Sequence, residues 1–375
     1  MNRESQLHLE PGTVPHPGNM VEEYLDLNGW SQRDLARRTN LTPKTISEIC
    51  NGKAPITPPT ALAFEKVLRR PAHLWLNFQR RYDESKARAK ESARFVEWAD
   101  WVGKFPIKEM RKRHFALPEG CSDIEALLNF FEVSSPESWR TVWSAYSVAY
   151  RQTHAVKVLE ESVSAWVREV EIQAKAFHMD SFDEELFISS LKTVKSLSRG
   201  RLNENTIGVL QETCARFGVA VVIVPELPNT GVSGCARWLS DTTAAVGLTL
   251  RYKTDDQLWF TLFHELGHIL LHRNKKSFVV DNAVDDLTDR AIDPEMQKFE
   301  SEANRFSSDT LISPSELDEF LRKGEFTNES IPAFAERIGV GPGIVVGRLQ
   351  HDKFLKPHQG NSFKQRLKWS TEKEG

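Results

Sequence analysis

Residues 260–272 read FTLFHELGHILLH, and this stretch decides how the chain is interpreted. His264 and His268 are four residues apart, so on a helix their side chains lie on one face, one turn apart. Two imidazoles at that spacing can bind one Zn²⁺, and Glu265 beside them can act as a general base toward water. The same spacing also arises by chance in helices that bind no metal. Here the apolar neighbours favour a packed helix that holds ligands rigidly, so we predict a zinc site.

The third metal ligand is expected from a second helix, at roughly residues 295–311, which contains KFESEANRFSSDTL. Glu300 is the preferred ligand, because Asn304 lies one helical turn beyond it and can orient a ligand. Glu302 is the alternative, and either acid could instead be a solvated surface residue. His272 lies eight residues after His264, about 12 Å along a helix axis. It is therefore expected to cap the helix C-terminus and not to bind the metal.

The elements around this stretch predict a small α+β domain of zincin type. A helix over TIGVLQETCARFG precedes an apolar strand, VAVVIVP, at residues 219–225. A second strand, AAVGLTL at residues 244–250, is expected at the sheet edge, where an extended substrate could pair with it. A polar loop over residues 273–293 and a closing helical pair within residues 331–354 complete the domain. A group that stabilises the negative charge of the tetrahedral intermediate is not evident from the sequence. Weak candidates are Arg251, Tyr252 and His351, and each of them is more often structural.

The N-terminal part predicts short helices joined by tight turns. Ser31 and Asp34 have the spacing of a capping box, and Asn40 tolerates the left-handed backbone of a sharp turn. Thr42 followed by Pro43 signals the start of the next helix. Such a helix-turn-helix unit places the beginning of its second helix in the major groove of DNA. A small helical domain that binds protein is the alternative.

The predicted DNA contacts lie on and around that second helix. Residues near the beginning of the second helix are expected to contact base edges or nearby phosphates. The flanking polar residues are expected to contact the DNA backbone. The full predicted set is Gln32, Thr42, Lys44, Thr45, Ser47, Asn51 and Lys53. Residues 19–91 carry thirteen Lys and Arg against nine Asp and Glu, although the whole chain has a net charge of −3. This basic segment allows a polyanionic partner without proving one.

Composition places the chain among cytoplasmic globular proteins of several domains. It has 375 residues, of which 40% are hydrophobic and 27% charged. The four cysteines are far apart, which argues against disulfides and against a cysteine-built metal site. We see no secretory signal in the polar, proline-rich N-terminus and no run long and apolar enough to cross a membrane.

The fold class is therefore multidomain and mainly α, with one small α+β domain. The predicted domains are a flexible N-terminus (1–18), a helix-turn-helix domain (19–91), a helical linker or sensor region (92–205), a zinc peptidase domain (206–350) and a C-terminal tail (351–375).

Two stretches resemble known families. Residues 29–83, GWSQRDLARRTNLTPKTISEICNGKAPITPPTALAFEKVLRRPAHLWLNFQRRYD, look like the Xre-type domain of HigA-like antitoxins. That resemblance implies operator binding, usually as a homodimer, and often autorepression. RYKTDDQLWFTLFHELGHILLH, followed by ESEANRFSSDTLISP, resembles the ImmA/IrrE metallopeptidases. This second resemblance implies zinc on His264, His268 and a glutamate of the second motif, Glu265 as base, and cleavage of a specific regulator.

The leading hypothesis is a DNA-binding regulator with a zinc endopeptidase that cleaves a specific regulatory protein, or the chain itself, in a stress, phage or toxin–antitoxin response. The alternative is a non-proteolytic HigA-like antitoxin or autorepressor with a structural or vestigial zinc site. The intact Glu265 favours the enzyme. A weaker idea makes the middle region a toxin-binding surface through its aromatic residues, which more often form a core. These are Trp98, Trp101, Trp139, Trp143 and Trp166.

Overall fold

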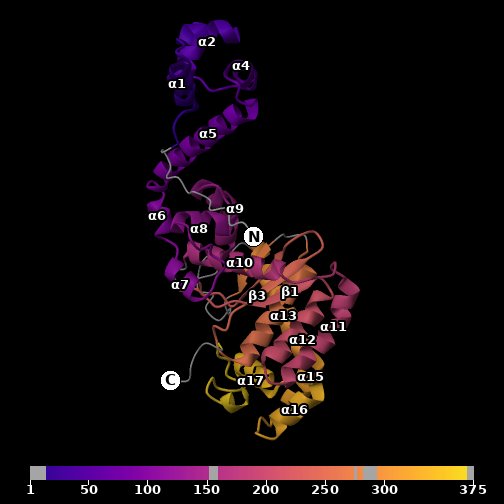
Figure 1. Ribbon diagram of the computed structural model, residues 1–375. Coiled ribbons are helices and arrows are strands. Elements are labelled where there is room, and N and C mark those ends of the chain that lie inside the picture. The colour runs from indigo at the N-terminus through magenta and orange to yellow at the C-terminus, as the bar shows by residue number, and fades with distance from the viewer. Residues whose placement is uncertain (1–13, 152–158, 274–276, 282–293, 370–375) are drawn as a thin grey trace. The chain divides into compact units, whose positions relative to one another are not determined.

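A computed structural model shows two compact units, residues 1–100 and 101–375, each described here by itself (Figure 1). The structure describes residues 14–151, 159–273, 277–281 and 294–369. The predicted flexible segment 1–18 falls largely outside these residues, although Pro17 and Gly18 begin the first helix. No helix in the described ranges combines the length and apolarity that a membrane span requires.

The first unit is a bundle of short helices followed by one long helix. Its core contains Leu35, Ile46, Phe64 and Trp75, none of which has measurable exposure. The helices are α1 (Pro17–Asn28), α2 (Gln32–Thr39), α3 (Pro43–Cys50), α4 (Pro58–Leu68) and α5 (Ala72–Phe95), with α6 (Ala99–Val102) at the boundary to the second unit.

The predicted turn between α2 and α3 is confirmed. Ser31 and Asp34 form the capping box that begins α2. Asn40 ends α2 in the left-handed region at φ 57°. Thr42 then caps α3, because its hydroxyl accepts from the Thr45 amide at 3.0 Å. The local signals of the sequence therefore suffice to fix this part of the fold.

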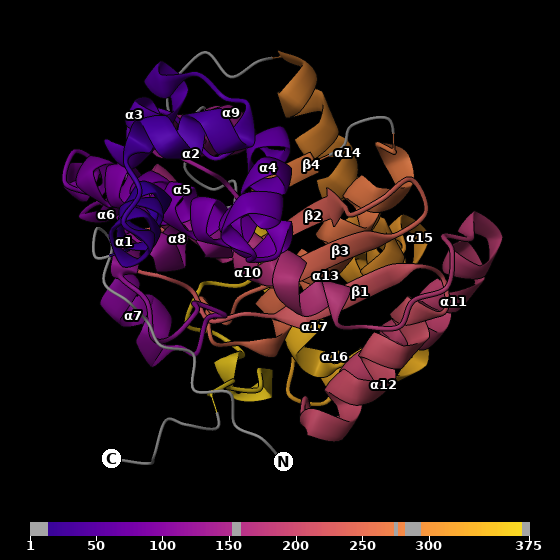
Figure 2. The ribbon, with the colours of Figure 1, turned by 45° about the horizontal axis from the view of Figure 1, so that its top comes forward.

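The second unit places a four-stranded sheet, within the described residues, among helices (Figure 2). The strands are β1 (Val219–Ile223), β2 (Gly234–Trp238), β3 (Ala244–Leu248) and β4 (Ser277–Asp281). The helices are α7 (Ile107–Lys112), α8 (Asp123–Phe131), α9 (Pro136–Arg151), α10 (Glu160–Lys175), α11 (Glu184–Ser196), α12 (Glu204–Ala215), α13 (Asp255–Leu271), α14 (Pro294–Leu311), α15 (Pro314–Lys323), α16 (Ser330–Ile338) and α17 (Pro342–His351). The described residues also include the 3₁₀ turns η1 (Leu197–Arg199) and η3 (Asn361–Phe363).

The sheet order is β1-β3-β2-β4, which corrects one expectation of the sequence analysis. β3 pairs in parallel with β1 and antiparallel with β2, so it is a central strand and not an edge. A substrate cannot add to β3, because both of its hydrogen-bonding sides are occupied. β2 is not predicted from the sequence, and β4 lies where a polar loop is expected, although β4 pairs with β2.

Helices α10 and α13 cover opposite faces of the sheet. A Cβ on Gly247 of β3 would meet Val170 of α10 at 2.5 Å. A Cβ on Gly234 of β2 would meet Thr261 of α13 at 2.6 Å. Gly234 pairs with Leu248, the neighbour of Gly247, and successive residues of a strand point to opposite faces. The sheet is therefore covered on both sides, which explains why β1 and β3 are continuously apolar.

The predicted middle region is not a unit of its own among the described residues. Helix α10 packs on β1 and β3, and Phe187 and Val194 of α11 belong to the core around the sheet. The five tryptophans considered as partner contacts are all buried, with exposed fractions from 0% to 8%. Their burial supports the core interpretation over the binding surface.

The end of the chain also packs on the sheet domain. The Gln365 carbonyl accepts from the Asp255 amide at 3.0 Å, and the Gln365 amide donates to the Asp255 carboxylate at 2.8 Å. Lys364 forms an ion pair of 2.7 Å with Asp256. The segment beyond residue 351 thus closes over the beginning of α13.

Candidate metal centre and DNA interface

Helix α13 holds both predicted imidazoles in the interior of the domain. Asp255 and Asp256 lie in its first turn, where the positive end of the helix dipole favours acidic side chains. His264 and His268 are 0% and 2% exposed, and their ring centroids lie 4.6 Å apart. The two Nε2 atoms are separated by 2.9 Å. The four-residue spacing therefore brings two ring nitrogens to one point.

Helix α14 adds Glu300 at the same point. Its Oε2 lies 3.2 Å from His264 Nε2, and its Oε1 lies 3.5 Å from His268 Nε2. One ligand atom from each of these three residues lies within 4.8 Å of the others. The alternative ligand, Glu302, is not part of this cluster, because its carboxylate contacts His272.

The nitrogens that point away from the cluster also have partners. The Asn304 side-chain oxygen lies 2.9 Å from His264 Nδ1, as expected of a residue that orients a ligand. His268 Nδ1 lies 3.1 Å from His272 Nδ1, and His272 Nε2 lies 3.0 Å from Glu302 Oε2. His272 also ends helix α13, and its amide donates to the His268 carbonyl. The predicted capping position of His272 is confirmed, and its contacts with His268 and Glu302 add to it.

The electrostatics suit a bound cation. Burial lowers the pKa of His268 to about 4, so its ring is neutral near pH 7. Burial alone would raise the pKa of the Glu300 carboxyl, but the two histidine rings that face it hold that pKa well below its ordinary value. Neutral imidazoles with an ionised carboxylate form the protonation state that a divalent metal requires. The three residues therefore fit a metal site by donor type, charge and convergence.

Glu265 follows His264 on α13 and lies against strand β2. It is 1% exposed. A Cβ built on Gly234 would come within 2.7 Å of its Oε1, so only glycine leaves this carboxylate its present position. Sequence reasoning missed Gly234, because the role of this glycine depends on the packing of β2 against α13.

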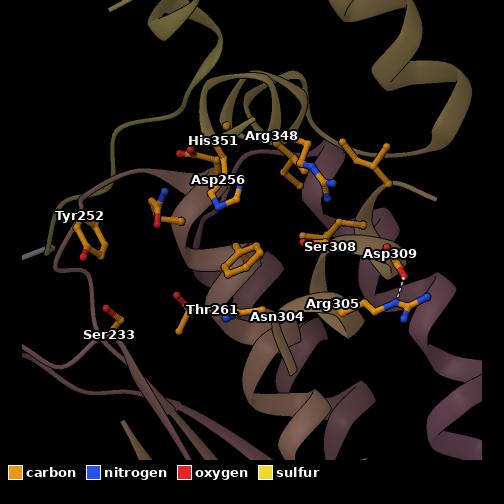
Figure 3. A pocket seen from close by; sticks show the side chains of 16 residues that line it. Ser233, Tyr252, Asp256, Thr261, Asn304, Arg305, Ser308, Asp309, Arg348 and His351 are labelled. Atoms are coloured by element: carbon orange, nitrogen blue, oxygen red, sulfur yellow. Dashed lines mark hydrogen bonds and ion pairs between the residues drawn. The ribbon is translucent and has the colours of Figure 1, made fainter. Parts of the chain in front are cut away.

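A cavity of about 460 Å³ lies between α13, α14 and α17 (Figure 3). None of the three candidate ligands lines it, but Phe260, Thr261 and Asn304 do, and these lie about one turn from His264 and Glu300. In Figure 3, Ser233, Thr261 and Asn304 lie on one side of the cavity and Arg348 and His351 on the other. The cavity is therefore adjacent to the candidate metal centre along the same two helices.

The three weak candidates for stabilising the tetrahedral intermediate, Arg251, Tyr252 and His351, do not lie at one place in the structure. Tyr252 and His351 line the cavity, and His351 Nδ1 lies 2.9 Å from the neighbouring Asp352 carboxylate. Arg251 instead bonds to the carbonyl of Gly231. None of the three lies in the His264, His268 and Glu300 cluster.

The predicted DNA contacts fall into two groups on the first unit. Lys44 extends from the first turn of α3 with its side chain 83% exposed and lies 3.8 Å from Glu48. Thr45 is half-buried, and its hydroxyl lies 2.8 Å from that of Thr42. These three positions surround the beginning of α3, the end that a helix-turn-helix presents to bases.

The flanking residues lie at the end of α3, in the loop that follows it and at the beginning of α2. Asn51 folds back onto α3, where its amide donates to the Ser47 carbonyl at 2.8 Å. Lys53 is exposed in the loop that follows, and Gln32 is half-buried at the beginning of α2. The structure thus places the predicted residues around the two helices, and their contacts with DNA stay a prediction.

Comparison with known proteins finds a family match within each unit. Residues 21–75 match the helix-turn-helix family, and residues 245–350 match the IrrE N-terminal-like domain, a peptidase family. The uncharacterized HTH-type transcriptional regulator YddM of Escherichia coli is 34% identical over 73 residues, which are 20% of this chain and 78% of that protein. Virulence-associated protein I of Dichelobacter nodosus is 39% identical over 69 residues, 18% of this chain and 64% of its own.

Solved structures match the N-terminal part of the chain. An addiction module antidote protein of a HigA family from Coxiella burnetii is 32% identical with a TM-score of 0.21, over 24% of this chain and 96% of its own. A putative antidote protein of a plasmid maintenance system from Nostoc punctiforme is 27% identical with a TM-score of 0.22, over 24% and 94%. The chain belongs to the helix-turn-helix regulators through its N-terminal domain and carries an IrrE-like peptidase domain toward its C-terminus.

Proposed function

We propose that this chain is a transcriptional regulator whose IrrE-like domain is a zinc-dependent endopeptidase that cleaves a specific regulatory protein or the chain itself. The observation that carries the proposal is the buried convergence of His264, His268 and Glu300, with Glu265 next to them on the same helix. Two imidazoles and one carboxylate, with no thiolate, form the ligand set of catalytic zinc sites in metallopeptidases.

The residues have separate roles in this proposal. His264, His268 and Glu300 hold the metal, which when bound polarises the scissile carbonyl and acidifies water. Glu265 takes the proton of the attacking water and delivers it to the leaving amine. A structural zinc site has no need of a general base, which supports catalysis over a purely structural role.

The cavity beside the metal centre supports recognition of one substrate side chain. Its volume of about 460 Å³ exceeds that of any single side chain, so it admits a large residue with water. Its walls combine the apolar Phe260, Leu311 and Ile344 with polar groups such as Gln257 and Ser308. A pocket of this kind confers selectivity, as cleavage of one regulator requires.

DNA binding is assigned to the first unit, which we propose acts as a homodimer on an operator. Helix α3 enters the major groove, with Thr42, Lys44 and Thr45 toward bases or nearby phosphates. Ser47 lies on the same helix, and Gln32, Asn51 and Lys53 contact the DNA backbone. Cleavage of a partner or of the chain itself then changes transcription.

The deciding experiment compares cells that carry the wild type with cells that carry Glu265→Gln. We expect the variant to keep one equivalent of zinc, because Glu265 is not a ligand, and to lose cleavage. A peptide that disappears only in wild-type cells identifies the substrate. If Glu265→Gln still cleaves, the assigned base is wrong. If no protein differs between the strains, the chain is the non-proteolytic repressor or antitoxin with a structural zinc.

A further inference from the structure

His272 and Glu302 lie behind the metal centre, outside the three ligands. His272 follows His268 by one turn of α13, and its side chain is 2% exposed. Its ring contacts Phe299 of α14 with centroids 4.5 Å apart. Glu302 reaches it from α14 and is 43% exposed. A buried ring thus connects a ligand histidine to a carboxylate at the protein surface.

The contacts specify where each proton lies. A carboxylate only accepts, so His272 Nε2, 3.0 Å from Glu302 Oε2, carries a hydrogen and donates it. A neutral imidazole with a hydrogen on Nε2 has its lone pair on Nδ1. That lone pair faces His268 Nδ1 at 3.1 Å, so His268 donates from Nδ1. The lone pair of His268 then lies on Nε2, the atom that faces Glu300 and His264.

From this geometry we infer that His272 and Glu302 are positioning residues that hold His268 in the tautomer that binds the metal. The inference rests on the proposed metal site. His264 has a simpler version of the same support, because Asn304 accepts directly from its Nδ1. Helix α14 therefore supplies the third ligand, Glu300, and two groups that fix the proton positions of the other two ligands. Partners of this kind typically change metal affinity by 10–100-fold when removed.

The test measures zinc affinity of the full chain by competition with a chromophoric chelator. His272→Phe keeps a ring against Phe299 but removes the acceptor, and we expect it to weaken zinc binding 10–100-fold. His272→Asn keeps an oxygen near the position of Nδ1, and we expect its affinity within a few-fold of wild type. Asp309→Asn is the matched control, because this carboxylate on α14 pairs with Arg305 and is not part of the His264, His268 and Glu300 cluster. It should leave zinc affinity unchanged.

The second pair of variants tests the carboxylate and covers the case in which His272→Phe does not fold. Glu302→Gln retains an oxygen acceptor for His272 and should bind zinc nearly as the wild type does. Glu302→Ala removes the acceptor and should bind more weakly than Glu302→Gln. Nitrogen-15 NMR of the zinc-free wild type should show the His268 proton on Nδ1, because the contacts with His272 and Glu302 set this tautomer before zinc binds.

The results separate this inference from the proposed function. Equal zinc affinity of wild type, His272→Phe and Glu302→Ala would overturn the positioning role while leaving the metal site intact. A His268 proton on Nε2 would overturn it as well. A wild-type chain that binds no zinc would instead refute the metal site on which the inference rests.

Discussion

Replacing Gly267 by alanine should weaken metal binding without unfolding the domain. Gly267 lies between His264 and His268 on the side of α13 that faces α14. A Cβ at this position would lie 2.9 Å from Phe306 Cδ1, about 0.5 Å closer than the 3.4 Å at which ordinary contact begins. We expect Phe306, and with it α14, to move away from α13, because the ring is partly buried against the core. Glu300 lies on α14 less than two turns from Phe306, so it moves as well.

The size of each energetic effect shows whether Gly267→Ala changes the stability of the domain or its affinity for zinc. Alanine is more favourable than glycine inside a helix by about 1 kcal/mol, and overpacking a core costs about 1–3 kcal/mol. The net change in the free energy of unfolding is therefore small. Metal–ligand distances tolerate only about 0.2 Å, so a displacement of about 0.5 Å removes most of the contribution of Glu300. We expect zinc affinity to fall at least tenfold while the melting temperature shifts by only a few degrees.

Two further variants make the reasoning refutable. Phe306→Ala in the Gly267→Ala background removes the 2.9 Å contact and leaves nearest contacts of 3.4 Å, so it should restore zinc affinity. Gly208→Ala in α12 is the matched control, because a Cβ there meets nothing within 4 Å. It should be neutral or slightly stabilising. If Gly267→Ala binds zinc as tightly as Gly208→Ala does, the close approach of α13 and α14 does not control the site.

Lys44→Ala with Thr45→Ala should weaken operator binding in gel shifts and leave zinc content unchanged; unchanged shifts would place the DNA contacts elsewhere. Burial raises the pKa of Asp255 to about 6 from 3.8, so the folded chain holds this proton more tightly and wild-type stability falls as pH rises from about 4 to 6. Asp255→Asn removes that loss, and denaturant titration at pH 7 should find it more stable by at most about 3 kcal/mol, with no gain at pH 4. Gly234→Ala should displace Glu265 and lower turnover in a cleavage assay while zinc affinity stays at the wild-type value.

The histidine pair was predictable because its geometry is local. A spacing of four residues on one helix fixes the relation of His264 to His268 whatever surrounds them. The choice between Glu300 and Glu302 was open, because it depends on how α14 is rotated against α13. That rotation is set by tertiary contacts, among them Gly267 against Ala303 and Phe306. Asn304, one turn beyond Glu300, nevertheless favours Glu300 as the ligand, and Glu300 lies in the cluster.

The sheet was less predictable for a related reason. β1 and β3 are apolar runs that indicate strands by themselves. β2 contains Arg237, whose guanidinium lies 3.5 Å from Glu171 of α10, a partner that no local pattern reveals. β4 lies within a polar stretch and is defined by its pairing with β2. Because the central position of β3 depends on β2, missing β2 led directly to the wrong edge assignment.

Different elements of the fold hold the candidate metal ligands and the proposed general base. The two parts of the proposed function can therefore be tested separately. The ligands depend on α14, through Glu300, Asn304 and the packing at Gly267. Glu265 depends on β2, through the space that Gly234 leaves. A change at Gly267 should therefore reduce metal affinity first, and a change at Gly234 should reduce turnover at full metal loading. Loss of both properties together in both variants would mean that the two supports act as one, and that Glu265 is held by the metal and not by the sheet.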